Sequence, residues 1–178
     1  MENSLLGLNT ERLVLRQLVE DDADFLVQLM NDPDWLAYIG DRNVKTREAA
    51  LQHIHEAPHK MYIEKQFGML MVIRKDTGAR IGLAGILSRR EFQEPDLGYG
   101  FVPAGRGAGF AYEATSALMK VAKESGRFSV LRGLVHPGNK ASRALLEKLG
   151  FTLMSPQPAC PWENTLIYEN RLKSSENE

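Results

Sequence analysis

A glycine-rich turn between a strand-like and a helix-like segment constrains this chain more than any other feature. Glycines occupy positions 105, 107 and 109, and an apolar pattern of helical period follows from Gly109 to about Lys123. Glycine allows positive φ angles and lets a ligand approach the backbone closely. Unpaired N–H groups at a helix N-terminus attract anions. We therefore expect a phosphate or pyrophosphate site in this turn.

The spacing of the glycines excludes two familiar phosphate motifs. In a G-x-G-x-x-G fingerprint the final glycine would fall at Phe110 or Tyr112, and no Gly-Lys-Ser/Thr follows as in a P-loop. The remaining pattern is Arg-x-x-Gly-x-Ala, in which the Arg106 guanidinium can contact a phosphate directly. A turn that merely connects a strand to a helix is the alternative. The residues of the expected site are Arg106, Gly107, Ala108, Gly109, Phe110 and Ala111.

Length and composition indicate one globular domain. With 178 residues, 43% hydrophobic and 25% charged, the chain suffices for one well-packed domain. We expect a single domain over residues 1–178, with its core at about 9–172 and a polar tail at 173–178. The net charge of −1 does not favour nucleic acid binding. No membrane span, no signal sequence and only one cysteine are found in the sequence, which favours a cytoplasmic protein.

The periodicity of the apolar residues predicts alternating strands and helices. Strands are expected at 13–18, 67–74, 80–88, 96–102, 129–135, 151–154 and 164–171. A first helix is expected at about 20–30, where Asn31-Asp32-Pro33 ends it, and a second helix is expected from Thr46 until Pro58 stops or distorts that helix. Two further helices are expected at 109–123 and at 139–149. This order predicts a mixed α/β (α+β) sheet of about six to seven strands with four helices, rather than a doubly wound parallel sheet.

One short segment matches a zinc-protease motif by its letters. His55-Glu56-Ala57-Pro58-His59 fits H-E-x-x-H, which works because both histidines lie on one face of a helix. Pro58 lacks an amide hydrogen and clashes with the carbonyl of Ile54. We therefore expect the two imidazoles to lose their i, i+4 relation, and we predict no metal site.

A second stretch, residues 135–151, resembles the closing half of the GNAT acetyltransferase core. From Asn139 to Phe151 it reads NKASRALLEKLGF, which is most similar to the RimJ/RimL branch. The opening segment at 10–16, TERLVLR, also resembles the first strand of that branch, and Asp32-Pro33 follows it. The resemblance covers roughly residues 9–172, with both motifs in the family's order.

The resemblance implies a GNAT fold with acetyl-CoA as the donor. In that fold the strands at 96–102 and 129–135 splay apart and the thioester lies between them. Residues 106–111 match the family's pyrophosphate loop, and Phe101 and Val102 match the strand end whose backbone pairs with the pantetheine arm. Asn139 matches a residue that hydrogen-bonds the pantetheine or orders the thiol end. It is also well placed as the N-cap of its helix.

Catalytic roles are less firmly implied. Ser142 matches a hydroxyl that serves the leaving thiolate in this branch, although a surface role or a water-mediated route stays open. Leu146 stands where many GNAT proteins carry a tyrosine general acid. Asp96 and Glu94 are candidate bases or water-orienting groups, with a solvated loop as the alternative. The backbone N–H near Val102 is the expected donor to the oxyanion.

The acceptor side is the least defined. In this fold the first-helix region and the last hairpin usually line the acceptor groove, so aromatic residues in these segments are candidate wall residues. Packing in the core or at the rim is the alternative role for each of them. Tyr99 could point inward or toward the cleft, and Cys160 has no required role because no covalent nucleophile is needed. The candidate wall residues are Trp35, Tyr38, Trp162 and Tyr168.

We therefore expect an acetyl-CoA-dependent N-acetyltransferase acting on a primary amine, preferably a protein N-terminal α-amine of the ribosomal-protein type. Small amines, such as polyamines, antibiotics or amino acids, remain open as acceptors. A non-catalytic acyl-CoA-binding module, favoured by Leu146, and a nucleotide-binding protein are the rival classes. We expect no nucleic acid or membrane partner, and either a monomer or a homodimer.

Overall fold

The structure is a computed structural model that describes residues 2–172, so the expected polar tail at 173–178 lies outside the described residues. Within that range eight strands form one sheet in the order β1-β2-β3-β4-β5-β6-β8-β7. The strands are β1 (Gly7–Asn9), β2 (Leu13–Gln17), β3 (Met69–Arg74), β4 (Arg80–Leu87), β5 (Asp96–Phe101), β6 (Val130–Val135), β7 (Thr152–Leu153) and β8 (Leu166–Arg171). Neighbouring strands are antiparallel except β5 and β6, which are parallel. The expected mixed sheet is confirmed, with the short β1 added.

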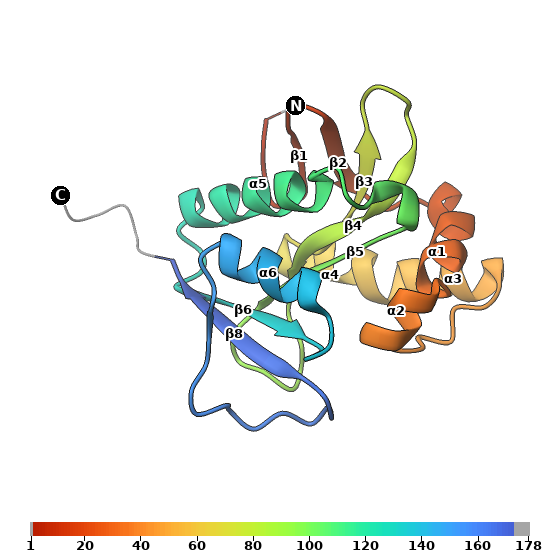
Figure 1. The fold of residues 1–178 in the computed structure, drawn as a ribbon. Coiled ribbons are helices and arrows are strands. Elements are labelled where there is room, and N and C mark those ends of the chain that lie inside the picture. Colours follow the sequence, from red (N-terminus) through yellow and green to blue (C-terminus); the bar gives the residue numbers. More distant parts are fainter. Residues whose placement is uncertain (1, 173–178) are drawn as a thin grey trace.

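Helices cover both faces of this sheet (Figure 1). They are α1 (Ala23–Met30), α2 (Pro33–Tyr38), α3 (Arg47–Ile54), α4 (Lys60–Lys65), α5 (Phe110–Glu124) and α6 (Lys140–Lys148). Successive residues of β3 point to opposite faces, so Leu70 joins the core under α5 while Met71 joins the core under α1 and α3. No helix among the described residues has the length and apolarity needed to span a bilayer.

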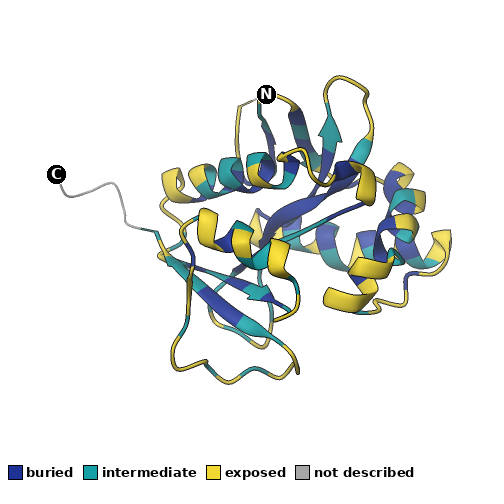
Figure 2. Ribbon diagram, viewed as in Figure 1, coloured by how far each residue is buried: buried dark blue, intermediate teal, exposed yellow. Residues whose placement is uncertain are grey.

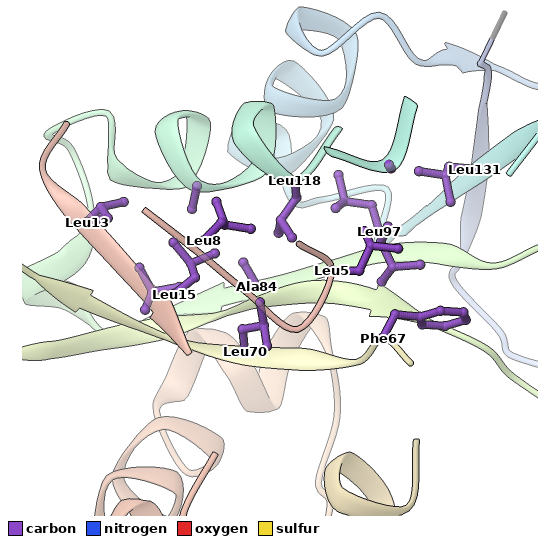
Figure 3. Close-up of a cluster of buried hydrophobic side chains, with 14 of the residues drawn as sticks. Leu5, Leu8, Leu13, Leu15, Phe67, Leu70, Ala84, Leu97, Leu118 and Leu131 are labelled. Atoms are coloured by element: carbon purple, nitrogen blue, oxygen red, sulfur yellow. The ribbon is translucent and has the colours of Figure 1, made fainter. Parts of the chain in front are cut away.

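The larger core lies between α5 and the sheet. Leu118 of α5 is buried with Leu8, Leu15 and Leu97 from three strands or their flanks (Figure 3). The apolar side of α5 has the predicted helical spacing, since Ala114, Leu118 and Ala122 are all buried. Figure 2 shows the central strands buried and the outward turns of α5 exposed. This packing fixes the N-terminus of α5 beside the end of β5.

The two prolines interrupt the helices as expected, but each also belongs to a further helical element. Pro33 does not merely end α1: the Asp32 carboxylate accepts a hydrogen bond from the amide of Asp34 at 3.1 Å, and Pro33 then occupies the first position of α2. Proline is favoured there because that N–H has no partner in any helix. Pro58 is absorbed by one π-helical turn (His55–His59) that joins α3 to α4. The described residues therefore hold six α-helices rather than four.

A buried carboxylate fastens the start of α1 to the sheet. Asp22 is 0% exposed and accepts hydrogen bonds from the Arg16 guanidinium at 2.7 and 2.9 Å, from Arg80 at 2.6 Å and from the Val19 amide at 2.8 Å. Burial alone would raise the pKa of Asp22, but these hydrogen bonds outweigh it and the pKa is lowered.

The strands β5 and β6 diverge, as the resemblance to the GNAT core implied. They pair at a single position, Asp96 with Arg132, whereas β4 and β5 pair over six positions. Beyond Asp96 one edge of β5 has no neighbouring strand, and a gap opens in the middle of the sheet. This gap sets the position of the candidate site.

Candidate active site

The turn before α5 carries a run of backbone N–H groups without partners. Gly107 and Gly109 have φ angles of 78° and 81°, and Gly109 is the N-cap of α5 with no side-chain hydrogen bond. The first amide after Arg106 that donates to a backbone carbonyl is that of Glu113, which donates to the carbonyl of Gly109 at 3.0 Å. The amides of residues 107–112 donate to no backbone carbonyl of the described chain. Such a set of N–H groups at a helix N-terminus suits a phosphate or pyrophosphate.

Arg106, which we expected to contact a phosphate directly, lines the cavity, but its guanidinium is already paired within the protein. It donates to Asp32 and Asp34 at 2.7 Å each, and its Nε donates to the carbonyl of Phe101 at 2.9 Å. Both carboxylates come from the start of α2, more than 70 residues earlier in the chain. Arg106 therefore ties the turn to α2 and to the end of β5.

A cavity of about 1250 Å³ follows the gap between β5 and β6. The turn before α5 lines it, as do Phe101 at the end of β5 and Leu134 of β6. Within the expected site, Arg106, Gly107, Gly109, Phe110 and Ala111 line the cavity, whereas Val102 and Ala108 do not. The volume and the mixed lining suit an extended ligand that reaches from the turn into the gap.

The free backbone N–H groups at the open edge of β5 belong to residues other than Val102, whose amide we expected to be the donor to the oxyanion. The amide of Val102 donates to the carbonyl of Ile81 at 3.0 Å, so it is not free to meet an oxyanion. Hydrogen-bonding direction alternates along an antiparallel strand, so Tyr99 and Phe101 direct their N–H groups away from β4 and into the gap. Their N–H groups are the backbone donors that β5 offers to the gap.

Ser142 and Tyr99 meet across the gap. The Tyr99 hydroxyl lies 2.7 Å from Ser142 Oγ and donates to the carbonyl of Ser142 at 3.2 Å. Burial raises the pKa of Tyr99 to about 12, although the hydrogen bond with Ser142 opposes that rise. Tyr99, which the sequence left unassigned, thus holds the hydroxyl of Ser142 at the cavity wall.

Asn139 and Leu146 of the α6 region stabilise the fold, Asn139 as the N-cap of the helix and Leu146 as a core side chain. Asn139 is the N-cap, and its side chain accepts from the Ser142 amide at 3.2 Å, as the capping reading predicted. It also lines the cavity. Leu146 is fully packed against β6, where a Cβ at Gly133 would come within 2.6 Å of it. The position of the family's tyrosine is therefore filled by a core side chain.

Asp96 and Glu94 lie in different surroundings. Asp96 is buried, lines the cavity and is held by Arg89 through two hydrogen bonds of 2.7 and 3.1 Å. Burial raises the pKa of Asp96 and Arg89 opposes that rise. Glu94 is outside the cavity lining and forms an ion pair with Arg132 at 3.0 Å. Of the two carboxylates, only Asp96 is placed to act in the cavity.

Three of the four expected aromatic wall residues line the cavity, namely Trp35, Tyr38 and Trp162. Trp35 is buried against β5, so close to Gly100 that a Cβ there would come within 2.5 Å of its ring. Its Nε1 is buried without a partner in the described chain. Tyr168 instead lies in the core, with its hydroxyl near Arg143 and Glu147, and is not a wall residue.

Two further polar residues in the cavity wall were missed by sequence reasoning. Arg42 precedes α3 and His53 lies within it, and both line the cavity. Desolvation lowers the pKa of His53, and the charge of Arg42 lowers it further against the opposing effect of Glu56. The neutral imidazole is therefore favoured. Because α3 carries no local motif around His53, only the fold could reveal this position.

The two histidines of the H-E-x-x-H match lie closer together than we expected. The His55 and His59 rings stay adjacent, with centroids 5.1 Å apart, because the π-helical turn accommodates Pro58. Their Nε2 atoms face Glu20 at 3.0 Å and the carbonyl of Leu18 at 2.8 Å. Among residues 2–172 no group of three metal-ligating side chains is found. Cys160 is half-buried outside the cavity lining.

Comparisons with known proteins agree with this geometry. A family profile described as "Acetyltransferase (GNAT) domain" matches residues 12–152. The "Uncharacterized N-acetyltransferase YoaA" of Bacillus subtilis (strain 168) is 29% identical over 168 residues, covering 94% of each chain. An acetyltransferase structure from Agrobacterium tumefaciens str. C58 has a TM-score of 0.81 at 28% identity, covering 96% of this chain and 97% of that one.

A structure of RimL, described as a ribosomal L7/L12 alpha-N-protein acetyltransferase in complex with coenzyme A, has a TM-score of 0.77 and covers 92% of this chain and 96% of that one. At 18% identity this likeness shows the fold alone. The chain belongs to the GNAT acetyltransferase family and is an N-acetyltransferase. RimL-type enzymes are among its structural neighbours, as the sequence resemblance indicated.

Proposed function

We propose that this enzyme transfers an acetyl group from acetyl-CoA to a primary amine, preferably the N-terminal α-amine of a protein. The observation that carries the proposal is one continuous cavity that joins the free amides of the turn to the open edge of β5 and to Ser142. No metal is required, because acyl transfer from a thioester needs positioning, a hydrogen-bond donor and proton transfer.

On the donor side, we assign the pyrophosphate of acetyl-CoA to the amides of residues 107–112. The positive φ angles of Gly107 and Gly109 keep these amides pointing outward without side-chain obstruction. The pantetheine arm would then follow β5, where Tyr99 and Phe101 offer backbone groups that β6 does not use. Arg106 serves this site by holding the turn against Asp32 and Asp34.

For proton transfer, we assign Ser142 as the donor to the leaving thiolate, with Tyr99 as the residue that positions it. Their hydroxyls are 2.7 Å apart, which allows a proton to pass between them. His53 is the favoured base for the incoming ammonium, because the lowered pKa keeps its imidazole neutral and able to accept a proton. Asp96, already bound by Arg89, is better suited to ordering water or the acceptor.

The preference for a protein α-amine is supported by the RimL neighbour, whose described substrate is a ribosomal protein. The test is a panel of amines incubated with acetyl-CoA, followed by thiol release and by mass spectrometry of each acceptor. We expect a peptide with a free N-terminus to gain one acetyl group. The same peptide with a blocked N-terminus and an internal lysine should not react.

Other results would select the alternatives. Acetylation of polyamines, antibiotics or free amino acids without reaction of peptides would move the function to small amines. Tight CoA binding with no thiol release from any amine would favour an acyl-CoA-binding module. A single cysteine and acetyl-CoA use fit a cytoplasmic enzyme.

A further inference from the structure

The cavity wall contains a cation that no residue of the described chain neutralises. Arg42 lines the cavity but forms no hydrogen bond or ion pair with any of residues 2–172. The adjacent carboxylate, Asp41, is paired with Lys45 at 3.1 Å. The nearby Asp96 is paired with Arg89 at 2.7 Å. The local carboxylates are therefore already used by other cations.

Arg42 is exposed to solvent in the wall of the cavity, so its guanidinium is accessible to a ligand. Desolvation lowers the pKa of Arg42, the charge of Arg89 lowers it further, and Asp96 opposes both. Because Arg89 and Asp96 cancel, one positive charge is left at this end of the cavity. His53 also lines it and favours its neutral form beside Arg42.

Two other charged residues of the cavity lining are without ion pairs in the described chain, Lys140 and Glu163. Lys140 is the first residue of α6, next to Asn139, and lies on the side of the cavity assigned to the donor. Glu163 is exposed in the loop before β8, beside Trp162. Neither is coupled to the Arg89–Asp96 pair as Arg42 is.

An unpaired arginine in an acceptor cavity selects among amines by charge. A polycation such as a polyamine or an aminoglycoside would place like charge beside the unpaired guanidinium of Arg42. An amine that carries a carboxylate would neutralise Arg42, whose planar guanidinium binds carboxylates with two parallel hydrogen bonds. The part of the cavity around Arg42 is therefore better matched to an anionic group of the acceptor than to a second cation.

We propose that the acceptor of this enzyme bears a carboxylate close to its reactive amine, and that Arg42 binds that carboxylate. The proposal rests on the proposed acetyl transfer and specifies its acceptor. The carboxylate can come from an acidic side chain near a peptide N-terminus or from the α-carboxylate of a free amino acid. Both present the same group to the guanidinium.

The test uses pairs of acceptors with and without a carboxylate, and each pair is compared between the wild type and Arg42→Gln so that differences in the pKa of the reactive amine cancel. The first pair is the C-terminally amidated peptides Ser-Glu-Ala-Ala and Ser-Gln-Ala-Ala, the second is alanine and alaninamide, and spermidine is the polycation. The acidic or carboxylate-bearing member of at least one pair should have a kcat/KM about 10- to 100-fold higher, as expected for hydrogen bonds to a charged group. The pair that responds identifies the source of the carboxylate.

The variant Arg42→Gln should remove this preference mainly through KM, so that the carboxylate-bearing member of the pair loses more kcat/KM than the neutral member; any change that acts through the pKa of His53 is common to both members. Arg42→Lys should keep part of the preference, because it keeps the charge without the planar fork. Arg90→Gln is the control, since Arg90 is exposed in the loop between β4 and β5 and lies outside the cavity lining. Equal rates within both pairs, a preference for spermidine, or equal losses for both members in Arg42→Gln would overturn the proposal.

Binding of the same acceptors to the enzyme–CoA complex separates this proposal from the proposed function. Calorimetry should show tighter binding of the acidic peptide or of alanine, lost in Arg42→Gln. If this holds and no acceptor is acetylated, the acetyl transfer is wrong and the carboxylate site stands. If acetylation occurs without any charge preference in binding or rate, the carboxylate site is wrong and the acetyl transfer stands.

Discussion

Gly109→Ala isolates the contribution of the turn to donor binding. Gly109 has a φ angle of 81°, and a Cβ there would meet only a guanidinium nitrogen of Arg12, at 3.5 Å. That distance is an ordinary contact, so the added methyl group does not collide with the fold. The cost arises from the backbone, because an L-residue in the left-handed region loses about 1–2 kcal/mol. The turn can relieve this strain only by rotating the amides that follow it.

The expected loss of affinity follows from the number of amides that move. A hydrogen bond to a charged group contributes about 1.5–3 kcal/mol, so misaligning one amide of residues 107–112 should weaken CoA binding about 10- to 100-fold. Stability should fall by only the backbone cost, which for a chain of this size lowers Tm by about 2–8 °C. Binding and stability are therefore affected to different extents.

Gly126→Ala is the matched control. Gly126 lies just beyond the other end of α5 with a φ angle of 63° and open space around its Cα. Calorimetric titration with CoA and thermal unfolding should show similar losses of stability in the two variants, and a loss of CoA affinity in Gly109→Ala alone. CoA affinity unchanged in Gly109→Ala, or reduced equally in both, would refute the assignment of the turn.

Three other variants test the remaining roles. Tyr99→Phe should lower kcat about tenfold and Ser142→Ala about 100-fold or more, because general acid catalysis contributes roughly that much. CoA affinity should change little in either variant. Thiol-release kinetics and CoA titration measure both quantities, and a variant with a wild-type kcat would exclude the substituted residue from proton transfer. His53→Gln should lower kcat/KM and abolish the decrease of kcat/KM at low pH. In the wild type that decrease should lie below the ordinary histidine pKa of about 6.5, because the pKa of His53 is lowered. An unchanged pH–rate profile would contradict the role of His53 as the base. Asp22→Asn should cost about 2–3 kcal/mol in urea unfolding at neutral pH, since two partly solvated guanidinium groups lose their carboxylate. In the wild type this stability is present above about pH 4 and is lost as the pH falls toward the lowered pKa of Asp22, and the variant should lack that part of the acid dependence.

The sequence predicted the framework of the site because the framework is encoded locally. Glycine spacing and a following helical period identified the turn at 105–109 and α5. The N-cap at Asn139 was recognised in the same way. The mixed sheet followed from the order of the elements, and its splay from the family resemblance, with β5 and β6 paired only at Asp96 and Arg132.

What the sequence missed depends on contacts between distant segments. Arg106 was assigned to a phosphate because its neighbours are glycines, but Asp32 and Asp34 reach it from α2. The hydroxyl of Tyr99 could be oriented only by knowing that Ser142, 43 residues later, lies across the gap. The sequence also did not show that Pro33 starts α2, or that the π-helical turn at Pro58 leaves the His55 and His59 rings adjacent.

The most direct test of the central claim is a crystal structure of the enzyme with acetyl-CoA bound. We expect pyrophosphate oxygens within hydrogen-bonding distance of the amides of residues 107–112. We also expect the thioester between β5 and β6, next to Ser142. A pyrophosphate bound elsewhere, with the gap between β5 and β6 empty, would contradict the account.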